Sequence, residues 1–177
     1  MAEAVDAAGA LAGATRVLVR RLSDVGEMFL AGGDGEAEVY RVFEREHPEA
    51  PGDLVYGTTV IQPGLVGEEY FMTRGHYHVD PGAAELYFGL SGRGLILMQN
   101  AQAAREVAIG PRETVYIPPG YAHRTVNTSL AEPLVFLVCY GVRAGHDYDR
   151  IRREGWRHRV LRGPDGRPRV VEAGEAP

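Results

Sequence analysis

Short β-prone segments recur along most of the chain and limit the folds that it can adopt. They are rich in β-branched or aromatic residues, and Gly, Pro or Asn separates each from the next. They span residues 38–43, 54–61, 70–73, 85–90, 94–99, 114–117, 124–126 and 134–140. A spacing of roughly ten residues with such turns is typical of a β-sandwich or a β-barrel. We therefore predict an all-β fold.

Composition separates the two ends of the chain from this β-rich region. Residues 1–14 are rich in Ala and Gly and predict a flexible N-terminal arm, whereas residues 173–177 predict a frayed tail. The chain is 177 residues long, with 45% hydrophobic and 24% charged residues, which is the size and composition of one globular domain. We predict that this single domain spans residues 15–172.

Three further elements are predicted inside the domain. Residues 15–22 are apolar with alternation and could begin either a strand or a helix. The Ser-Asp pair at 23–24 favours the start of a short helix that runs through Leu30. Near the other end, the Gly-Pro-Asp-Gly turn at 163–166 predicts that residues 157–172 form two strands. We find no pattern for a second helical region.

Several classes of protein are disfavoured by the charge and the ends of the chain. The net charge is −5 with no basic run, so we do not expect nucleic acid as a partner. All 19 basic residues are Arg, and without Lys the chain cannot form a Schiff base, anchor pyridoxal phosphate or build a P-loop. No apolar run reaches the roughly 18 residues of a membrane span, and we expect no secretory signal. We therefore predict a cytoplasmic protein.

Three histidines and a glutamate have the spacing of a metal site. His76 and His78 are two positions apart, so on a strand both would face one side while Tyr77 faces the other. A later strand that carries His123, and the strand after His78 that carries Glu85, would complete the set. Three imidazoles and one carboxylate suit Fe(II), Mn(II), Ni(II) or Zn(II), and an octahedral shell would leave two positions for a substrate.

The other histidines and the single cysteine have simpler interpretations. His47 precedes a proline in a polar loop and His158 lies in the basic C-terminal stretch, so we predict that both are exposed to solvent. Cys139 has no partner for an internal disulfide and lies in an apolar run. We predict that Cys139 is a small buried side chain.

Two motifs resemble those of the cupin superfamily, whose fold is a small double-sheet barrel. The first is His-x-His followed by Glu85, with a glycine seven positions later at Gly92. The second is Pro-x-Gly-x-x-His-x-x-x-Asn at residues 118–127. Six residues separate His78 from Glu85, where three or four are usual in cupins. The resemblance implies a single cupin barrel.

Four segments resemble the cupin-type glucose-6-phosphate isomerases, in which the longer gap before the glutamate is normal. They are residues 57–60, 69–78, 122–127 and 145–148. The resemblance implies one divalent metal per subunit, Fe(II) foremost, and a homodimer that acts on a small sugar phosphate. The implied metal ligands are His76, His78, Glu85 and His123. The implied phosphate-binding residues are Tyr40, Thr59, Thr73, Gly75 and Tyr140. The implied residues around the sugar are Tyr87, His146 and Tyr148.

The chemistry of such an isomerase agrees with these residues. The reaction moves a proton from C2 to C1 through an enediol, and a divalent cation stabilises the charge that develops. Glu85 is the carboxylate that the motif places beside the reacting carbons, so we predict that it is both ligand and base. A metal-assisted hydride shift is the rival mechanism. His146 could help to open the sugar ring, and Tyr87 would contact the reacting end.

Two other functions stay open on the sequence. A three-histidine, one-glutamate iron site can also activate O2, which would make the protein an oxidative cupin or dioxygenase. A non-catalytic sugar-binding cupin is the second alternative, although that class would be marked by a degenerate ligand set. Product formed without oxygen would favour the isomerase.

Overall fold

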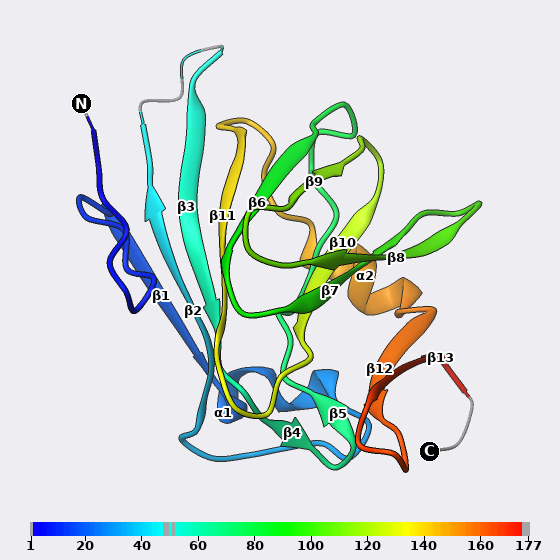
Figure 1. Ribbon diagram of the computed structural model, residues 1–177. Coiled ribbons are helices and arrows are strands. Elements are labelled where there is room, and N and C mark those ends of the chain that lie inside the picture. Colours follow the sequence, from blue (N-terminus) through cyan, green and yellow to red (C-terminus); the bar gives the residue numbers. More distant parts are fainter. Residues whose placement is uncertain (1, 48–49, 51, 175–177) are drawn as a thin grey trace.

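Two antiparallel sheets face one another and enclose most of the buried apolar side chains (Figure 1). The computed structural model describes residues 2–47, 50 and 52–174. The larger sheet has the order β1-β2-β3-β11-β6-β9 and the facing sheet the order β10-β7-β8, while a third sheet, β13-β12-β5-β4, lies at one end. The core contains Ile61 and Phe136 from the larger sheet and Ile96 from the facing one, all at most 1% exposed.

The strands pair only with antiparallel neighbours. The larger sheet comprises β1 (Arg16–Arg21), β2 (Glu38–Arg45), β3 (Leu54–Ile61), β11 (Leu134–Gly141), β6 (Glu85–Ser91) and β9 (Thr114–Ile117). The facing sheet comprises β10 (Ala122–Asn127), β7 (Gly94–Gln99) and β8 (Ala104–Ile109). The third comprises β13 (Pro168–Glu172), β12 (His158–Arg162), β5 (Glu69–Tyr70) and β4 (Leu65–Val66).

The predicted N-terminal helix is present but shorter than expected. It comprises α1 (Leu22–Val25) and the 3-10 turn η1 (Gly26–Met28). Asp24 stabilises its start because the Asp24 carboxylate accepts a hydrogen bond of 2.8 Å from the backbone N–H of Arg21. Among the described residues, no helix is long and apolar enough to cross a membrane.

A second helix, α2 (Tyr148–Glu154), was not predicted from the sequence. Its signals are local and weak: Asp147 caps the first turn by accepting from the Arg150 N–H at 2.9 Å, and Gly155 follows the last turn at φ +73°. Seven residues are too few for an apolar stripe to be visible in the sequence. This helix follows directly on the segment that carries His146.

One predicted strand is largely absent, and one strand of the structure was not predicted. Of residues 70–73, only Tyr70 lies in a named strand, and Met72 makes a single bridge to Val126. The edge strand β8 was missed because residues 104–109 are mostly polar or small and largely exposed, so they lack the apolar alternation of a half-buried strand. Residues 15–22 resolve as the strand β1 followed by the first residue of α1.

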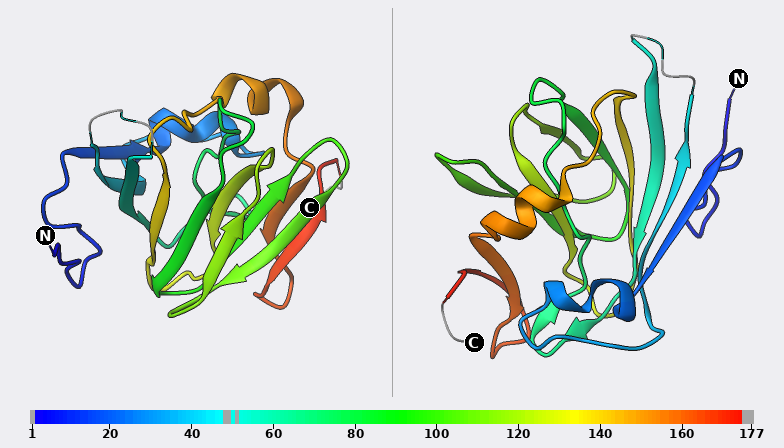
Figure 2. Two further views of the ribbon diagram at one scale, coloured as in Figure 1. Left: turned by 90° about the horizontal axis from the view of Figure 1, so that it is seen from above. Right: turned by 180° about the vertical axis from the view of Figure 1, so that it is seen from behind.

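The N-terminal residues lie against the outside of the larger sheet, and the hairpin β12–β13 lies on the opposite side of the molecule (Figure 2). The carbonyl of Gly9 accepts from the Thr58 hydroxyl, and Leu11 is 6% exposed. The predicted flexibility of residues 1–14 and the domain bounds stay predictions. Of the predicted tail at 173–177, Ala173 bonds through its N–H to the Arg157 carbonyl, and residues 175–177 lie outside the described residues.

Candidate active site

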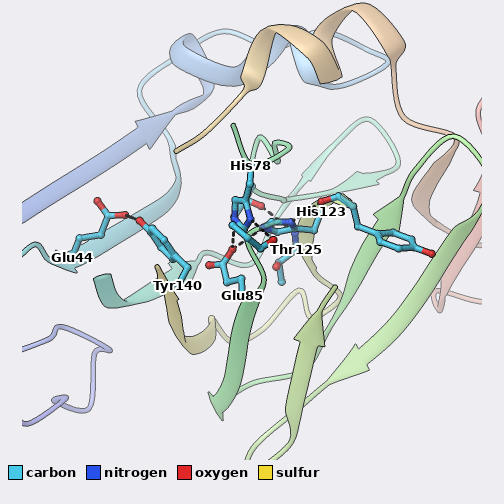
Figure 3. Close-up of polar contacts among 9 residues, drawn as sticks. Glu44, His78, Glu85, His123, Thr125 and Tyr140 are labelled. Atoms are coloured by element: carbon cyan, nitrogen blue, oxygen red, sulfur yellow. Dashed lines mark hydrogen bonds and ion pairs between the residues drawn. The ribbon is translucent and has the colours of Figure 1, made fainter. Parts of the chain in front are cut away.

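Four predicted metal ligands converge between the two main sheets. One ligand atom from each of His76, His78, Glu85 and His123 lies within 4.8 Å of the others (Figure 3). Glu85 opens β6 and His123 is the second residue of β10. Backbone hydrogen bonds between His76 and His123, of 3.2 and 3.0 Å, hold these two residues side by side.

The two closely spaced histidines do not lie on a regular strand, which corrects the prediction. His76 and Tyr77 each form one isolated bridge, to His123 and to Asp147. The alternation of side chains persists, because Tyr77 packs on the far side with Ala122. The backbone is extended enough to keep the alternation even where few ladder bonds form.

The donor atoms of the cluster fit a divalent cation. Backbone carbonyls lie near Nδ1 of His78, at 3.2 Å, and near Nδ1 of His123, at 3.4 Å. A carbonyl can only accept, so these Nδ1 atoms carry protons, and in the neutral imidazole, the form that binds a metal, Nε2 then presents a lone pair. Glu85 Oε2 lies 3.3 Å from Nε2 of His78 and 2.9 Å from that of His123. Lone pairs that face one another at these distances are stabilised by a cation.

Two buried nitrogens support the same interpretation. Nε2 of His76 and Nε2 of His123 have no hydrogen-bond partner among the described residues. A buried polar atom without a partner is costly, and a bound cation would remove that cost by accepting the nitrogen lone pair. The four residues therefore could hold a metal, as the sequence predicted.

The protonation states of the cluster are set by burial and by the neighbouring charges. Burial, together with the adjacent histidines, holds the pKa of His76 well below its usual value. Burial alone would raise the pKa of Glu85, but the adjacent His123 and His78 outweigh burial and the net pKa is lowered. A neutral imidazole and an ionised carboxylate are the forms that bind metals.

A pocket opens beside the cluster, and every predicted substrate residue lines it. The pocket also reaches His76, Glu85 and His123. The predicted lining residues are Tyr40, Thr59, Thr73, Gly75, Tyr87, Tyr140, His146 and Tyr148. The structure thus brings together residues from β2, β3, β6 and β11 and from the segments before β6 and around the start of α2.

His146 is held at the cluster by backbone pairing. Asp147 and Tyr77 exchange two backbone hydrogen bonds, of 2.7 and 3.3 Å, which tie the start of α2 to the segment of His76. The ring centroids of His146 and His76 are 4.1 Å apart. Burial lowers the pKa of His146 to about 4, so its imidazole is uncharged at neutral pH.

The most informative residue that the sequence analysis missed is Glu44. It lines the pocket and is buried, the Tyr140 hydroxyl donates to its Oε1 at 2.9 Å, and Arg16 lies 3.3 Å from its Oε2 (Figure 3). Alternation along β2 was the available signal, since Tyr40, Val42 and Glu44 share one face of the strand. The remaining missed lining residues are Arg16, Leu18, Val42, Phe136 and Val138, and Arg74 also lines the pocket.

The residues outside the site require two corrections. His47 is exposed, as predicted, but His158 is only 23% exposed in its side chain because it lies in β12, with Nδ1 3.4 Å from a Glu106 oxygen. Cys139 is half-buried, because it lies on the outer face of β11 and points away from the core.

The sequence as a whole matches one family. The family model for glucose-6-phosphate isomerase (GPI) matches residues 23–172. The chain belongs to this family. Curated members with the same name come from Thermococcus kodakarensis, 44% identical over 93% of this chain and 89% of the relative, and from Pyrococcus abyssi, 41% identical over the same shares. A bacterial member from Sinorhizobium medicae is 37% identical over 94% of this chain and 78% of the relative.

Solved structures show that this member of the glucose-6-phosphate isomerase family has the cupin fold, which confirms the all-β cupin prediction. Oxalate oxidase in complex with glycolate superimposes with a TM-score of 0.51 and 18% identity, over 64% of this chain and 56% of that one. Bacillus subtilis oxalate decarboxylase, a protein with Mn(II) centres, gives a TM-score of 0.50 and 22% identity, over 61% of this chain and 27% of that one.

Proposed function

We propose that the protein interconverts glucose 6-phosphate and fructose 6-phosphate in glycolysis and gluconeogenesis, with one divalent metal per subunit. The observation that carries this proposal is the convergence of three histidines and one glutamate on the wall of a pocket lined by hydroxyl groups. Membership of the glucose-6-phosphate isomerase family supports the same substrate pair.

The metal ligands would be His76, His78, Glu85 and His123. A bound divalent cation supplies Lewis acidity, which stabilises negative charge on the oxygens of C1 and C2 while the proton moves. Fe(II) is our first candidate, followed by Mn(II), Ni(II) and Zn(II), since imidazole and carboxylate ligands suit all four.

Proton transfer falls to Glu85 in this proposal. A Glu85 oxygen that takes the proton from C2 can return it to C1 on the same face of the enediol. Tyr87 lies two positions along β6 on the same face, and burial raises its pKa well above the usual value, so that it keeps its proton. Tyr87 can therefore donate a hydrogen bond to a substrate oxygen.

The phosphate would be bound by donors that line the pocket, namely Thr59, Thr73, Tyr40, Tyr148 and the Gly75 N–H. The Thr73 hydroxyl accepts from the Thr125 N–H at 3.0 Å, which leaves its own proton free for an anion. Gly75 at φ +73° turns the backbone in a way that few other residues tolerate, and it has no side chain to obstruct a close approach.

Removal and replacement of the metal test the proposed function. Chelation is expected to lower fructose 6-phosphate turnover by at least roughly a hundredfold, because Lewis-acid stabilisation is worth several kcal/mol. Single metals are then added back under anaerobic conditions, and the product is measured. Undiminished turnover by metal-free protein would refute the metal dependence, and a strict need for O2 would favour the oxidative cupin.

His146 is proposed to assist ring opening, because it lies beside the cluster at the wall of the pocket. His146→Ala is expected to lower turnover of glucose 6-phosphate by about a hundredfold, in the range of a lost acid–base group. Turnover of an analogue that cannot close its ring should fall much less in this variant. Equal losses on both substrates, measured as kcat, would contradict the ring-opening role.

We further propose a cytoplasmic homodimer with no nucleic-acid partner. The outer face of the larger sheet supports dimerisation, since Leu86, Phe88 and Tyr116 are 42%, 37% and 57% exposed there. Sedimentation equilibrium measures the mass of the assembly, and a monomer at micromolar concentration would contradict the dimer.

A further inference from the structure

The Tyr140 hydroxyl has no proton to offer to a ligand in the pocket. It donates its one proton to Glu44 at 2.9 Å (Figure 3). The Arg16 guanidinium lies 3.3 Å from the second Glu44 oxygen and pairs with this carboxylate, which can only accept. Toward the pocket, Tyr140 therefore presents lone pairs alone.

Strand register separates Tyr140 from Thr59 and Tyr40, two of the residues proposed to bind phosphate. Thr59 lies opposite Phe136, whereas Tyr140 lies four positions further along β11, opposite Val55. At about 3.3 Å per residue, this offset amounts to ~13 Å along the sheet. The same offset separates Tyr40 from Glu44 on β2. One phosphate group is too small to span that distance.

Tyr140 lies instead at the end of the pocket that holds the histidine cluster. It pairs with Glu85 across β11 and β6. Its ring centroid is 5.5 Å from that of His146 and 6.2 Å from that of His78. A substrate whose reacting carbons face Glu85 would thus bring its sugar hydroxyls to Tyr140.

The Tyr40 end and the Tyr140 end of the pocket also differ in the hydrogen-bonding groups and charges that they offer to a ligand. Phosphate oxygens of a dianion only accept, so a hydroxyl without a free proton, held against a carboxylate, repels them. Tyr40, by contrast, lies directly opposite Arg20 across β1 and β2, and the pocket wall near it includes Arg74. Anions are favoured at the Tyr40 end, and donors such as sugar hydroxyls are favoured at the Tyr140 end.

We infer that Tyr140 accepts a hydrogen bond from a sugar hydroxyl beside the metal cluster, and that Glu44 is the positioning residue that imposes this polarity. The inference rests on the proposed function and revises one part of it, since Tyr140 then lies outside the phosphate site. Glu44 acts through Tyr140 and helps to decide which end of a sugar phosphate faces Glu85.

Binding of two probes to the metal-loaded protein tests the inference by calorimetry. Inorganic phosphate occupies the phosphate end alone, and 1,5-anhydroglucitol 6-phosphate adds a sugar that cannot isomerise. Tyr140→Phe and Glu44→Ala, which removes the acceptor that holds the Tyr140 proton, are expected to weaken binding of the sugar probe by roughly five- to tenfold, the value of one hydrogen bond. Neither variant should weaken the binding of inorganic phosphate, whereas Thr59→Val should weaken the binding of both probes.

Glu46→Ala is the matched control, because Glu46 also pairs with Arg16, at 3.5 Å, but is exposed and makes no hydrogen bond to Tyr140 among the described residues. It should leave both affinities unchanged. A Tyr140→Phe variant that loses as much affinity for inorganic phosphate as for the sugar probe would overturn the inference, as would a wild type that binds neither. A wild type that binds both probes but fails to isomerise would instead refute only the proposed function.

Discussion

Glu85→Gln is expected to lower turnover of fructose 6-phosphate by about 10³-fold, which is the largest catalytic effect that the site predicts. The amide keeps the shape of the side chain but removes both the charge and the basicity. Glu85 is 3% exposed and its Oε2 lies 3.3 and 2.9 Å from two imidazoles, so the substitution removes the carboxylate of the cluster itself. The measurement is kcat of the metal-loaded variant, with metal content determined on the same sample.

Two controls separate the roles of Glu85 as ligand and as base. Glu113→Gln changes an exposed glutamate and should keep full turnover. Isomerisation of C2-deuterated substrate in water then tests proton transfer. Loss of label to solvent supports Glu85 as an exchanging base, whereas full retention at C1 excludes free exchange and leaves a shielded base or the hydride shift. A Glu85→Gln variant that binds metal normally and keeps its turnover would refute both roles.

Gly75→Ala is expected to lower the free energy of unfolding by about 3 kcal/mol or more, from steric overlap added to backbone strain. A Cβ at this position would lie 2.5 Å from Cζ2 of Trp156, 2.6 Å from Cβ of Arg124 and 2.7 Å from the carbonyl oxygen of His123. Because His76 follows at once and pairs with His123, the displacement should also weaken metal binding. Denaturant unfolding and a metal titration measure the two effects.

Gly120→Ala is the matched control for this substitution. Gly120 has a similar positive φ of +78°, but nothing lies within 4 Å of its added Cβ. Gly120→Ala should lower the free energy of unfolding only by the cost of the left-handed backbone conformation, roughly 1–2 kcal/mol. Equal losses at the two glycines would contradict the steric argument, since they would trace the whole effect to the backbone angle.

The local sequence pattern was enough to predict much of the fold. Strands β3, β7 and β9 have the predicted bounds, because each is a short run of strand-forming residues that ends at turn residues. The edge strand β8 and the helix α2 were missed for the converse reason. One is polar and exposed, and the other is too short to show a period, so tertiary contacts rather than sequence pattern stabilise them.

The sequence by itself identified the four residues that converge in the cluster and the direction of side chains along each strand. Spacing of two positions places His76 and His78 on one side, and the motif around His123 marks a second strand of the same pocket. These are properties of neighbouring residues, which covalent geometry fixes.

Only the tertiary structure decided which side chains meet across strands. Glu44 and Tyr140 are 96 positions apart, and their hydrogen bond depends on the register of β2, β3 and β11. Register follows from burial of a whole face and from turns elsewhere in the chain, so no local pattern encodes it. The hydrogen bond between Tyr140 and Glu44, and with it the separate sugar and phosphate ends that we infer, therefore came only from the folded protein.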